Sequence, residues 1–501
     1  MIFRDWLKEL DYTLLQGSVD VETEDVIYDS RKAAPGKVFV AMKGIRVDGH
    51  SFIPQVLKAG VRVLVTERPV EEELKNSGLS EDELKQVTVV MVEEGRHALA
   101  LLSAARFDHP AKKLVMIGVT GTKGKTTTTH MIRAILLAAG KKVGMIGTTG
   151  TVIGDVVTPT LNTTPESYEL HQAFAQMVEA GCEYAVMEVS SQGIKMHRTD
   201  GLYFNYAIFT NISPDHIGPG EHADFEEYLY YKTRLLNMCG IGLVNKDDEH
   251  APQIIKAANC ELYTYSEESK EADFVASDIS YVSQPDFVGT EFHISGKYDM
   301  EVRLGIPGLF NVVNALAAVS VCSFLGLDQA RISHALENIR VNGRMEIVYT
   351  SERCTVLVDY AHNAVSMESL LSTLRDYKPK RLVCVFGCGG NRSKDRRYSM
   401  GEIGGKMADL SIITADNSRY EKVEDIIADI RGSIEKTGGK FIEIPDRREA
   451  IRYSILHAQP GDMVAVIGKG HEDYQEINGV RHHFLDREVI EETVKELGEK
   501  A

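Results

Sequence analysis

GVTGTKGKTTTTH, residues 118–130, connects a predicted apolar strand to a predicted helix. The apolar run LVMIGVT (114–120) leads into its glycines, and Met131, Ile135 and Ala138 follow at helical spacing. In such a turn, successive backbone N–H groups and the N-terminus of the helix surround an anion. The segment therefore predicts a phosphate-binding loop, with a nucleoside triphosphate as its ligand.

The side chains of this loop fit the same ligand. Its glycines let the backbone wrap closely around a phosphate, and Lys125 is placed to reach the terminal phosphates. Thr126 or Thr127 offers a hydroxyl to Mg²⁺. A strict P-loop has a glycine where Val119 stands, so an ordinary Gly-rich turn is the alternative interpretation. GKTT between a strand and a helix favours the phosphate site.

Apolar runs recur along the rest of the chain, with helical segments between most of them. Strands that alternate with helices indicate parallel sheets covered on both faces. We predict an α/β protein of three domains: residues 1–112, a central P-loop domain with a parallel or mixed sheet (113–341), and a C-terminal Rossmann-like domain (342–501). The main predicted strands are VFVAM, VRVLV, VTVVMV, LVMIGVT, VGMIG, YAVMEV, YAIFTNI, IGLVN, TVLVDY, RLVCVFG, LSIITA, FIEI and MVAVIG.

Composition narrows the class of protein. The 56 Lys and Arg against 73 Asp and Glu give a net charge of −17, which disfavours nucleic acid and anionic membranes as main partners. The seven cysteines include no C-x-x-C pair, so we expect free thiols in a reducing compartment. Charged residues interrupt the N-terminal segment, and no apolar run is long enough to span a bilayer. We expect a cytoplasmic protein without membrane insertion.

Three further side chains are candidate metal ligands, each with a plain structural alternative. Glu188 ends a predicted strand, where P-loop enzymes place an acid that organises Mg²⁺, although buried strands often end in Glu. His216 follows the next strand and, taken alone, reads as a capping or core histidine. Lys232 lies on a helix with Asp224 at its N-cap and, taken alone, reads as a solvated lysine.

Taken together, the motifs of this chain resemble the Mur ligase family, and within it the MurE type, which adds the third residue of the peptidoglycan stem peptide. The resemblance extends along essentially the whole chain. Its motifs, in order, are DSRKAAPGKVFVAMKG (29–44), GVTGTKGKTTTTH (118–130), NTTPES (162–167), MEVSSQGIKMHR (187–198), FTNISPDHIG (209–218), FNVVNALAA (310–318), NGRME (342–346), DYAHN (359–363), GCGGNR (387–392), ADNSR (415–419) and GKGHEDYQ (468–475).

The resemblance implies an ATP site with Mg²⁺. Implied ATP-binding residues are Gly121, Thr122, Lys123, Gly124, Lys125, Thr126, Thr127, Asn311, Asn314, Arg344, Asp359 and His362. Implied metal ligands are Thr126, Glu188, His216 and Lys232, the last as a carbamate formed with CO₂. A lysine kept neutral by burial can capture CO₂, and the resulting anionic oxygens suit a hard cation. Lys125, Glu188, His216, Lys232 and Arg344 would carry the catalysis.

The resemblance also implies two substrates. The N-terminal domain would bind the UDP part of UDP-MurNAc-L-Ala-D-Glu, and a diamino acid would bind the C-terminal domain. Implied contacts to the UDP substrate are Ser30, Asn162, Thr163, Thr164, Ser190 and Arg198. Implied contacts to the amino acid are Arg392, Asp416, Asn417, Ser418, Arg419, Gly468 and Glu472. We expect a monomer with these small-molecule partners.

The identity of the diamino acid depends on two arginines. In the family, an Asp-Asn-Pro-Arg motif marks enzymes that use meso-diaminopimelate, because its Arg binds the distal carboxylate. Here Arg392 and Arg419 favour such a diacid, since a guanidinium grips a carboxylate bidentately. Ser418 stands in place of the proline and removes its fixed φ, so we expect a looser turn. L-lysine, ornithine or another diamino acid are the alternatives.

The implied reaction is an ATP-dependent ligation of a carboxylate to an amine through an acyl phosphate. One alternative is a paralogue with a folylpolyglutamate-like or other acceptor. Another is a P-loop switch whose output is conformational. Two features are interpreted plainly: RSKDRR (392–397), beyond Arg392, as a solvated charge run, and His482 with His483 as surface or packing residues.

Overall fold

The computed structural model describes residues 1–44, 47–218 and 220–498. The chain forms two compact units, Met1–Tyr265 and Ser266–Ala501. The domain boundaries predicted near residues 112 and 341 stay predictions.

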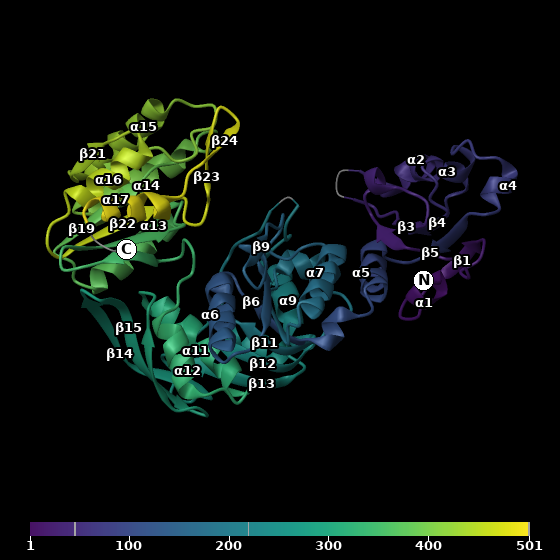
Figure 1. Ribbon diagram of the computed structural model, residues 1–501, viewed down its shortest axis with the longest axis horizontal. Helices are drawn as coiled ribbons and strands as arrows, with labels where there is room; N and C mark the ends of the chain where they lie inside the picture. Colours follow the sequence, from purple (N-terminus) through teal and green to yellow (C-terminus); the bar gives the residue numbers. More distant parts are fainter. Residues whose placement is uncertain (45–46, 219, 499–501) are drawn as a thin grey trace. The chain divides into compact units, whose positions relative to one another are not determined.

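The N-terminal part of the first unit is a five-stranded sheet with helices on both faces (Figure 1). The strand order is β1-β5-β4-β3-β2, and only β1 runs antiparallel to its neighbour. Alternate residues of β3 face opposite cores: Val38 packs with α1 and α5, and Phe39 packs with α2 and α3. The elements are α1 (Phe3–Trp6), β1 (Thr13–Gln16), β2 (Asp25–Ile27), η1 (Ser30–Lys32), β3 (Lys37–Val40), η2 (Gly49–Phe52), α2 (Ile53–Lys58), β4 (Val63–Thr66), α3 (Glu71–Lys75), α4 (Glu81–Leu84), β5 (Thr88–Met91), α5 (Gly95–Arg106) and η3 (Pro110–Lys113).

The rest of the first unit is built on a second sheet, in the order β13-β12-β11-β6-β10-β7-β8-β9. Its strands are parallel from β13 to β7, and β8 and β9 add an antiparallel hairpin. The elements are β6 (Val115–Thr120), α6 (Lys125–Ala138), β7 (Val143–Gly147), β8 (Gly150–Ile153), β9 (Val156–Thr158), α7 (Ser167–Glu179), β10 (Tyr184–Glu188), α8 (Ser191–Lys195), β11 (Phe204–Phe209), α9 (Phe225–Thr233), η4 (Arg234–Asn237), β12 (Cys239–Asn245), α10 (Ala251–Ala257) and β13 (Glu261–Ser266).

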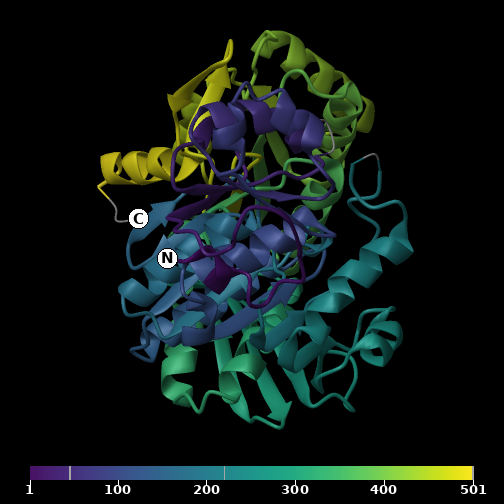
Figure 2. The ribbon, with the colours of Figure 1, turned by 90° about the vertical axis from the view of Figure 1, so that its right-hand side faces the viewer.

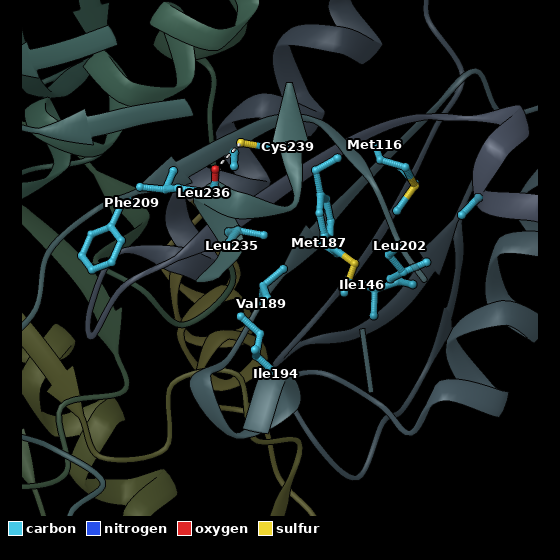
Figure 3. Close-up of a cluster of buried hydrophobic side chains, with 14 of the residues drawn as sticks. Met116, Ile146, Met187, Val189, Ile194, Leu202, Phe209, Leu235, Leu236 and Cys239 are labelled. Carbon is cyan, nitrogen blue, oxygen red and sulfur yellow. Dashed lines mark hydrogen bonds between the residues drawn. The ribbon is translucent and has the colours of Figure 1, made fainter. Parts of the chain in front are cut away.

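One face of this second sheet carries a large apolar core (Figure 3). Met116 and Met187 of the central strands β6 and β10 point into it, together with Leu235 and Leu236 of η4. Because β6 and β10 are buried on both faces, they read as continuous apolar runs and not as alternating ones. This burial holds the carboxyl ends of the parallel strands at one rigid edge.

The second unit begins with three antiparallel strands, β14 to β16, against which α11 and α12 pack (Figure 1). The hydroxyl of Tyr377 forms a hydrogen bond with Thr290 of β15 (2.9 Å) and accepts one from the backbone N–H of Gly308 (3.0 Å). The elements are β14 (Phe274–Gln284), β15 (Phe287–Gly296), β16 (Met300–Leu304), α11 (Leu309–Ser323) and α12 (Gln329–Glu337).

The C-terminal sheet has the order β17-β18-β22-β19-β20-β21, parallel except for β17. α16 and α17 cover one face, and α17 is the helix that leads to the C-terminus in Figure 2. The elements are β17 (Glu346–Thr350), β18 (Cys354–Asp359), α13 (Ala364–Asp376), β19 (Arg381–Phe386), α14 (Lys394–Met407), β20 (Leu410–Ile413), α15 (Val423–Thr437), β21 (Phe441–Glu443), α16 (Arg447–Leu456), β22 (Asp462–Ile467), β23 (Tyr474–Ile477), β24 (Val480–His483) and α17 (Asp486–Glu496).

These sheets confirm the predicted α/β class, and every strand predicted from an apolar run is present. The seven cysteines are free thiols, as expected. In the described part of the chain, no helix is long and apolar enough to cross a membrane. His482 and His483 lie exposed on β24, and the His483 ring contacts Glu488 (2.7 Å).

Candidate active site

The Gly-rich loop lies between the end of β6 and the start of α6. Gly121 has φ +144°, and a Cβ there would come 1.9 Å from Oγ1 of Thr210, so only glycine fits. Gly124, at φ +87°, turns the chain directly into α6. The Nζ of Lys125 donates to the carbonyls of Gly121 (2.8 Å) and Thr122 (3.1 Å). The loop is therefore a tight cradle with a cation lying against its carbonyls, which suits a polyphosphate.

Glu188 is held beside this loop by four hydrogen bonds. It ends β10, is only 1% exposed, and accepts from the Oγ1 of Thr126 at 3.0 Å on both carboxylate oxygens. Thr148 donates its backbone N–H (2.8 Å) and its hydroxyl (3.1 Å) to the same carboxylate. A Cβ at Gly147 would lie 2.3 Å from Oε1 of Glu188. A buried carboxylate next to a threonine hydroxyl and a phosphate loop fits a hard cation such as Mg²⁺.

Lys232 reaches the same loop from α9. Asp224 caps this helix by accepting the N–H of Glu227, as predicted. The side chain of Lys232 is 2% exposed, and its Nζ donates to the carbonyl of Gly121 (2.8 Å). Burial, with the charge of Lys125 adding to it, lowers the pKa of Lys232 well below its ordinary value. The interpretation of Lys232 as a solvated lysine is wrong, because α9 directs its side chain into the protein.

His216 lies near this cluster but is open to solvent. Its backbone adopts φ +53°, and its side chain is 53% exposed. The Nδ1 of His216 contacts Glu221 (3.2 Å), and its ring centroid lies 6.2 Å from that of Tyr228. The Tyr228 hydroxyl in turn forms a hydrogen bond with Oγ1 of Thr122 in the phosphate loop (3.1 Å). His216 is therefore not a core histidine.

Two loops implied to bind the UDP substrate are tied to each other. The hydroxyl of Thr164 donates to the carbonyl of Glu188 (3.0 Å) and accepts the N–H of Ser190 (2.9 Å). Arg198 donates from Nη1 to the carbonyl of Thr164 (3.0 Å) and pairs through Nη2 with Glu166 (2.7 Å). The substrate loops and the end of β10 thus form one structure.

The remaining residues implied to bind the UDP substrate lie in two other segments, Asn162 and Thr163 in one and Ser30 in the other. Thr163 forms a hydroxyl hydrogen bond with Thr148 (3.1 Å), and Asn162 is exposed beside it in sequence. Ser30 opens the short helix η1 at the end of β2. The nearby Tyr28 hydroxyl donates to the carboxylate of Glu169 on α7 (2.9 Å). Hydrogen bonding therefore connects the region of Ser30 to α7.

In the second unit, three of the residues implied for ATP gather around Tyr360. The guanidinium of Arg344 lies 4.9 Å from the Tyr360 ring, and Nδ1 of His362 contacts the Tyr360 carbonyl (2.9 Å). Burial raises the pKa of Asp359, which accepts the backbone N–H groups of Met345 (2.8 Å) and Ala361 (2.7 Å).

Asn311 and Asn314, on α11, are buried against each other. The side-chain amide of Asn311 donates to the carbonyl of Pro307 (2.7 Å), and that of Asn314 donates to Oδ1 of Asn311 (3.2 Å). These contacts fix the start of α11.

The residues implied to bind the amino acid follow the carboxyl ends of β19, β20 and β22. A Cβ at Gly468 would lie 2.8 Å from Oδ2 of Asp416, so the two loops are in close contact. The Asn417 amide donates to Oε2 of Glu472 (2.9 Å). Buried Lys469 donates to both, at 3.2 Å to Asn417 and 3.3 Å to Glu472. Open parallel sheets bind ligands at this edge, and the placement agrees with that rule.

Gly389 lies close to the side chains of both Arg419 and Arg392. A Cβ on Gly389 would lie 3.5 Å from Nη1 of Arg419 and 3.9 Å from Cγ of Arg392. The turn at buried Ser418 is not loose. The backbone N–H of Arg419 donates to the carbonyl of Glu476 (3.0 Å), and its carbonyl accepts the N–H of Asn478 (2.6 Å). Pairing with β23 thus fixes Arg419 although Ser418 stands in place of a proline.

The interpretation of RSKDRR, beyond Arg392, as a solvated charge run holds for exposed Ser393, Lys394 and Asp395 but is wrong at Arg397. Arg397 is 1% exposed and pairs with Glu421 (2.8 Å) and Asp429 (2.9 Å). The sequence interpretation also missed Thr148 and Lys469. Thr148 directly follows β7, and Lys469 is the second residue after β22, positions at strand ends that could have signalled them.

Comparison with known proteins gives consistent matches. The descriptions "Mur ligase family, catalytic domain", "Mur ligase middle domain" and "Mur ligase, glutamate ligase domain" match residues 23–107, 119–322 and 343–470. A UDP-N-acetylmuramoyl-L-alanyl-D-glutamate–2,6-diaminopimelate ligase of Caldanaerobacter subterraneus is 39% identical over 498 residues, covering 98% of each chain. The ligase of that name from Clostridium perfringens is 38% identical, covering 98% of this chain and 99% of its own.

Solved structures agree. A structure titled as a UDP-N-acetylmuramoyl-L-alanyl-D-glutamate–2,6-diaminopimelate ligase matches with a TM-score of 0.72 and 30% identity, covering 95% of this chain and 96% of its own. MurF from Acinetobacter baumannii, at 21% identity and a TM-score of 0.58, covers 90% of this chain and 91% of its own and shares the fold. Relatives this similar over the full length establish the family. The chain belongs to the Mur ligase family.

Proposed function

We propose that this protein joins meso-2,6-diaminopimelate to the D-Glu of UDP-MurNAc-L-Ala-D-Glu, at the expense of ATP, as a monomer in cytoplasmic peptidoglycan precursor synthesis. The observation that carries the choice of amino acid is the contact between the loops of Arg392 and Arg419, where Nη1 of Arg419 donates to the carbonyl of Gly390 (2.8 Å). Two arginines on adjoining loops suit a ligand with a second carboxylate, which L-lysine lacks. Full-length similarity to ligases with this name supports the same choice.

The first half-reaction transfers a phosphoryl group. The γ-carboxylate of D-Glu attacks the γ-phosphorus of ATP, the bond to the bridging oxygen breaks, and ADP leaves with that electron pair. Lys125, which lies against the loop carbonyls, can turn its ammonium toward the phosphates and offset the repulsion between two anions. Thr164, Ser190 and Arg198 would position the UDP substrate, because their hydrogen bonds connect them to the end of β10.

The second half-reaction forms the amide. An amine of diaminopimelate attacks the acyl carbon, and a tetrahedral intermediate expels phosphate while the nitrogen loses a proton. Glu472 and Asn417 would hold the amino-acid end of diaminopimelate, and Arg392 and Arg419 its distal carboxylate. This division of the ligand between its two ends supplies the orientation that the attack requires.

Thr126, Glu188, His216 and Lys232 would hold Mg²⁺, with Lys232 as an N-carboxylysine. When bound, the ion offsets the negative charge of the transferring phosphoryl group. Burial favours the neutral amine of Lys232, and its nitrogen can add to CO₂ with loss of one proton. The product is a carbamate, whose oxygens suit a hard cation.

The test is an omission experiment. ADP release is measured with ATP and Mg²⁺ while the UDP-dipeptide, the amino acid, or both are left out. The proposal expects ADP release at full rate only when both are present. Equal ADP release without either would instead support a P-loop switch.

A further inference from the structure

The two loops that carry Arg392 and Arg419 are joined by an ion-pair cluster around the buried Arg397. Glu421, two residues after Arg419, accepts the backbone N–H of Asn391, one residue before Arg392. The same carboxylate receives Nη2 of Arg397 at 2.8 Å on both oxygens. Glu421 therefore connects one arginine loop to the other.

Arg397 of α14 links this connection to helix α15. Its guanidinium is 1% exposed, and Nη1 donates to Asp429 of α15 (2.9 Å). Burial strengthens the pairing of this guanidinium with the bidentate Glu421 carboxylate, and Asp429 anchors its other side. The cluster thus runs from α15 through Arg397 of α14 to Glu421, and from there to the loop of Arg392.

Further contacts keep the loops in one register. The N–H of Gly390 donates to the carbonyl of Asn417 (2.9 Å), and Nη1 of Arg419 donates to the carbonyl of Gly390 (2.8 Å). A Cβ on Gly390 would lie 1.9 Å from the carbonyl oxygen of Ser418. The loops touch at their backbones, so a small shift of one changes the distance between the two arginines.

We propose that Arg397 and Glu421 are positioning residues that set the spacing of Arg392 and Arg419, and thereby the preference for a diamino acid with a second carboxylate. The inference rests on the proposed function. Neither residue contacts the ligand in this account. They act by holding the two loops that carry the arginines against each other, which sets where both guanidinium groups can reach a carboxylate.

The test compares Glu421→Gln with Asp429→Asn. Both remove one anionic partner of Arg397. Glu421 also accepts the backbone N–H of Asn391 beside Arg392, whereas Asp429 pairs with the exposed side chain of Lys394 at the start of α14 (3.0 Å). For Glu421→Gln we expect KM for meso-diaminopimelate to rise about tenfold or more, with KM for ATP and for the UDP-dipeptide within about twofold of wild type. Its preference for diaminopimelate over L-lysine, as a ratio of kcat/KM, should fall about tenfold. Asp429→Asn should keep the wild-type preference.

The outcomes distinguish failure of the positioning role from failure of the proposed function. If Glu421→Gln keeps the wild-type preference, or if Asp429→Asn loses it equally, the positioning role is refuted. Should Glu421→Gln not fold, Arg397→Lys serves in its place, with a smaller loss of preference expected and an unchanged one contradicting the inference. Wild-type protein that does not ligate diaminopimelate would refute the proposed function and this inference with it.

Discussion

The Nζ of Lys232 donates a 2.8 Å hydrogen bond to the carbonyl of Gly121, a residue 111 positions earlier in the chain. This bond brings a buried lysine of α9 to the phosphate loop, where Lys125 already contacts the same carbonyl. Burial depresses the pKa of Lys232, and the charge of Lys125 beside the same carbonyl adds to the effect. The arrangement favours a neutral, nucleophilic amine next to the expected site of phosphoryl transfer.

Replacing Lys232 tests this role. We expect Lys232→Ala to lower kcat of ligation at least about a hundredfold, because the loss removes an electrostatic contribution at the phosphoryl site. Acetate or formate should restore part of the activity by supplying the missing carboxylate. Lys85→Ala, at an exposed lysine, is the control and should match wild type. Full activity of Lys232→Ala without added carboxylate would contradict the carbamate.

Gly147 tests the position of Glu188. A Cβ at Gly147 would come 2.3 Å from Oε1, so Gly147→Ala must displace a carboxylate that Thr126 and Thr148 hold. We expect kcat to fall about tenfold to a hundredfold and the Mg²⁺ concentration for half-maximal rate to rise. Gly432→Ala is the matched control, because nothing lies within 4 Å of its Cβ position. A Gly147→Ala enzyme with wild-type Mg²⁺ dependence would show that Glu188 does not organise the metal.

Replacing Arg419 tests whether it recognises the distal carboxylate of meso-diaminopimelate. We expect Arg419→Ala to reduce kcat/KM for meso-diaminopimelate about a hundredfold, since truncating one partner of a buried charge pair costs about 2–5 kcal/mol. The low activity with L-lysine should change no more than about threefold, because lysine has no second carboxylate. Arg448→Ala, on the exposed face of α16, provides the control. An equal loss for both amino acids would remove Arg419 from specificity.

A histidine–aspartate cluster joins the first sheet's helix α5 to the loop before β11. Oδ2 of Asp200 lies 2.6 Å from Nδ1 of His97 and 2.8 Å from Nδ1 of His197. The hydrogen bond to Asp200 raises the pKa of His197 above 6.5. Burial acts to raise the pKa of Asp200, but the two imidazole contacts outweigh it and lower that pKa below 3.8.

The signs of these shifts define a pH window. The His197 contribution is complete below about pH 6.5 and is lost as pH rises through its raised pKa, whereas the Asp200 contribution is lost only in acid. Asp200→Asn should therefore melt about 1–3 °C below wild type near pH 6, as expected for a partly exposed pair. By pH 8.5 the difference should shrink. A deficit of the same size at both pH values would contradict the assignment.

Local patterns predicted much of the fold and the site. The phosphate loop was found because a buried parallel strand reads as an apolar run that ends in glycine. The motifs after β18, β19, β20 and β22 came from the family resemblance, and their place after apolar runs agrees with it. The antiparallel strands β14 to β16 were not predicted, since their exposed faces dilute the apolar signal.

Burial of charged residues could not be predicted from the sequence. Arg397 looks like part of a charge run, because its partners Glu421 and Asp429 lie 24 and 32 residues away. The burial of Lys232 is likewise not visible in the sequence, because it depends on the position of α9 beside Gly121. The turn at Ser418 seemed loose because the hydrogen bonds of Arg419 to β23 depend on a hairpin nearly 60 residues later. These features depend on contacts between residues far apart in the sequence, which a short stretch of sequence cannot show.

The most direct test of the central claim is a ligation assay with products identified by mass. Purified protein, ATP, Mg²⁺ and UDP-MurNAc-L-Ala-D-Glu are offered meso-diaminopimelate, L-lysine, L-ornithine or D-lysine in separate reactions. We predict a UDP-tripeptide with meso-diaminopimelate at a kcat/KM at least about a hundredfold above that for any monocarboxylic diamine. A tripeptide formed equally well with L-lysine, or ATP hydrolysis without product from all four, would contradict it.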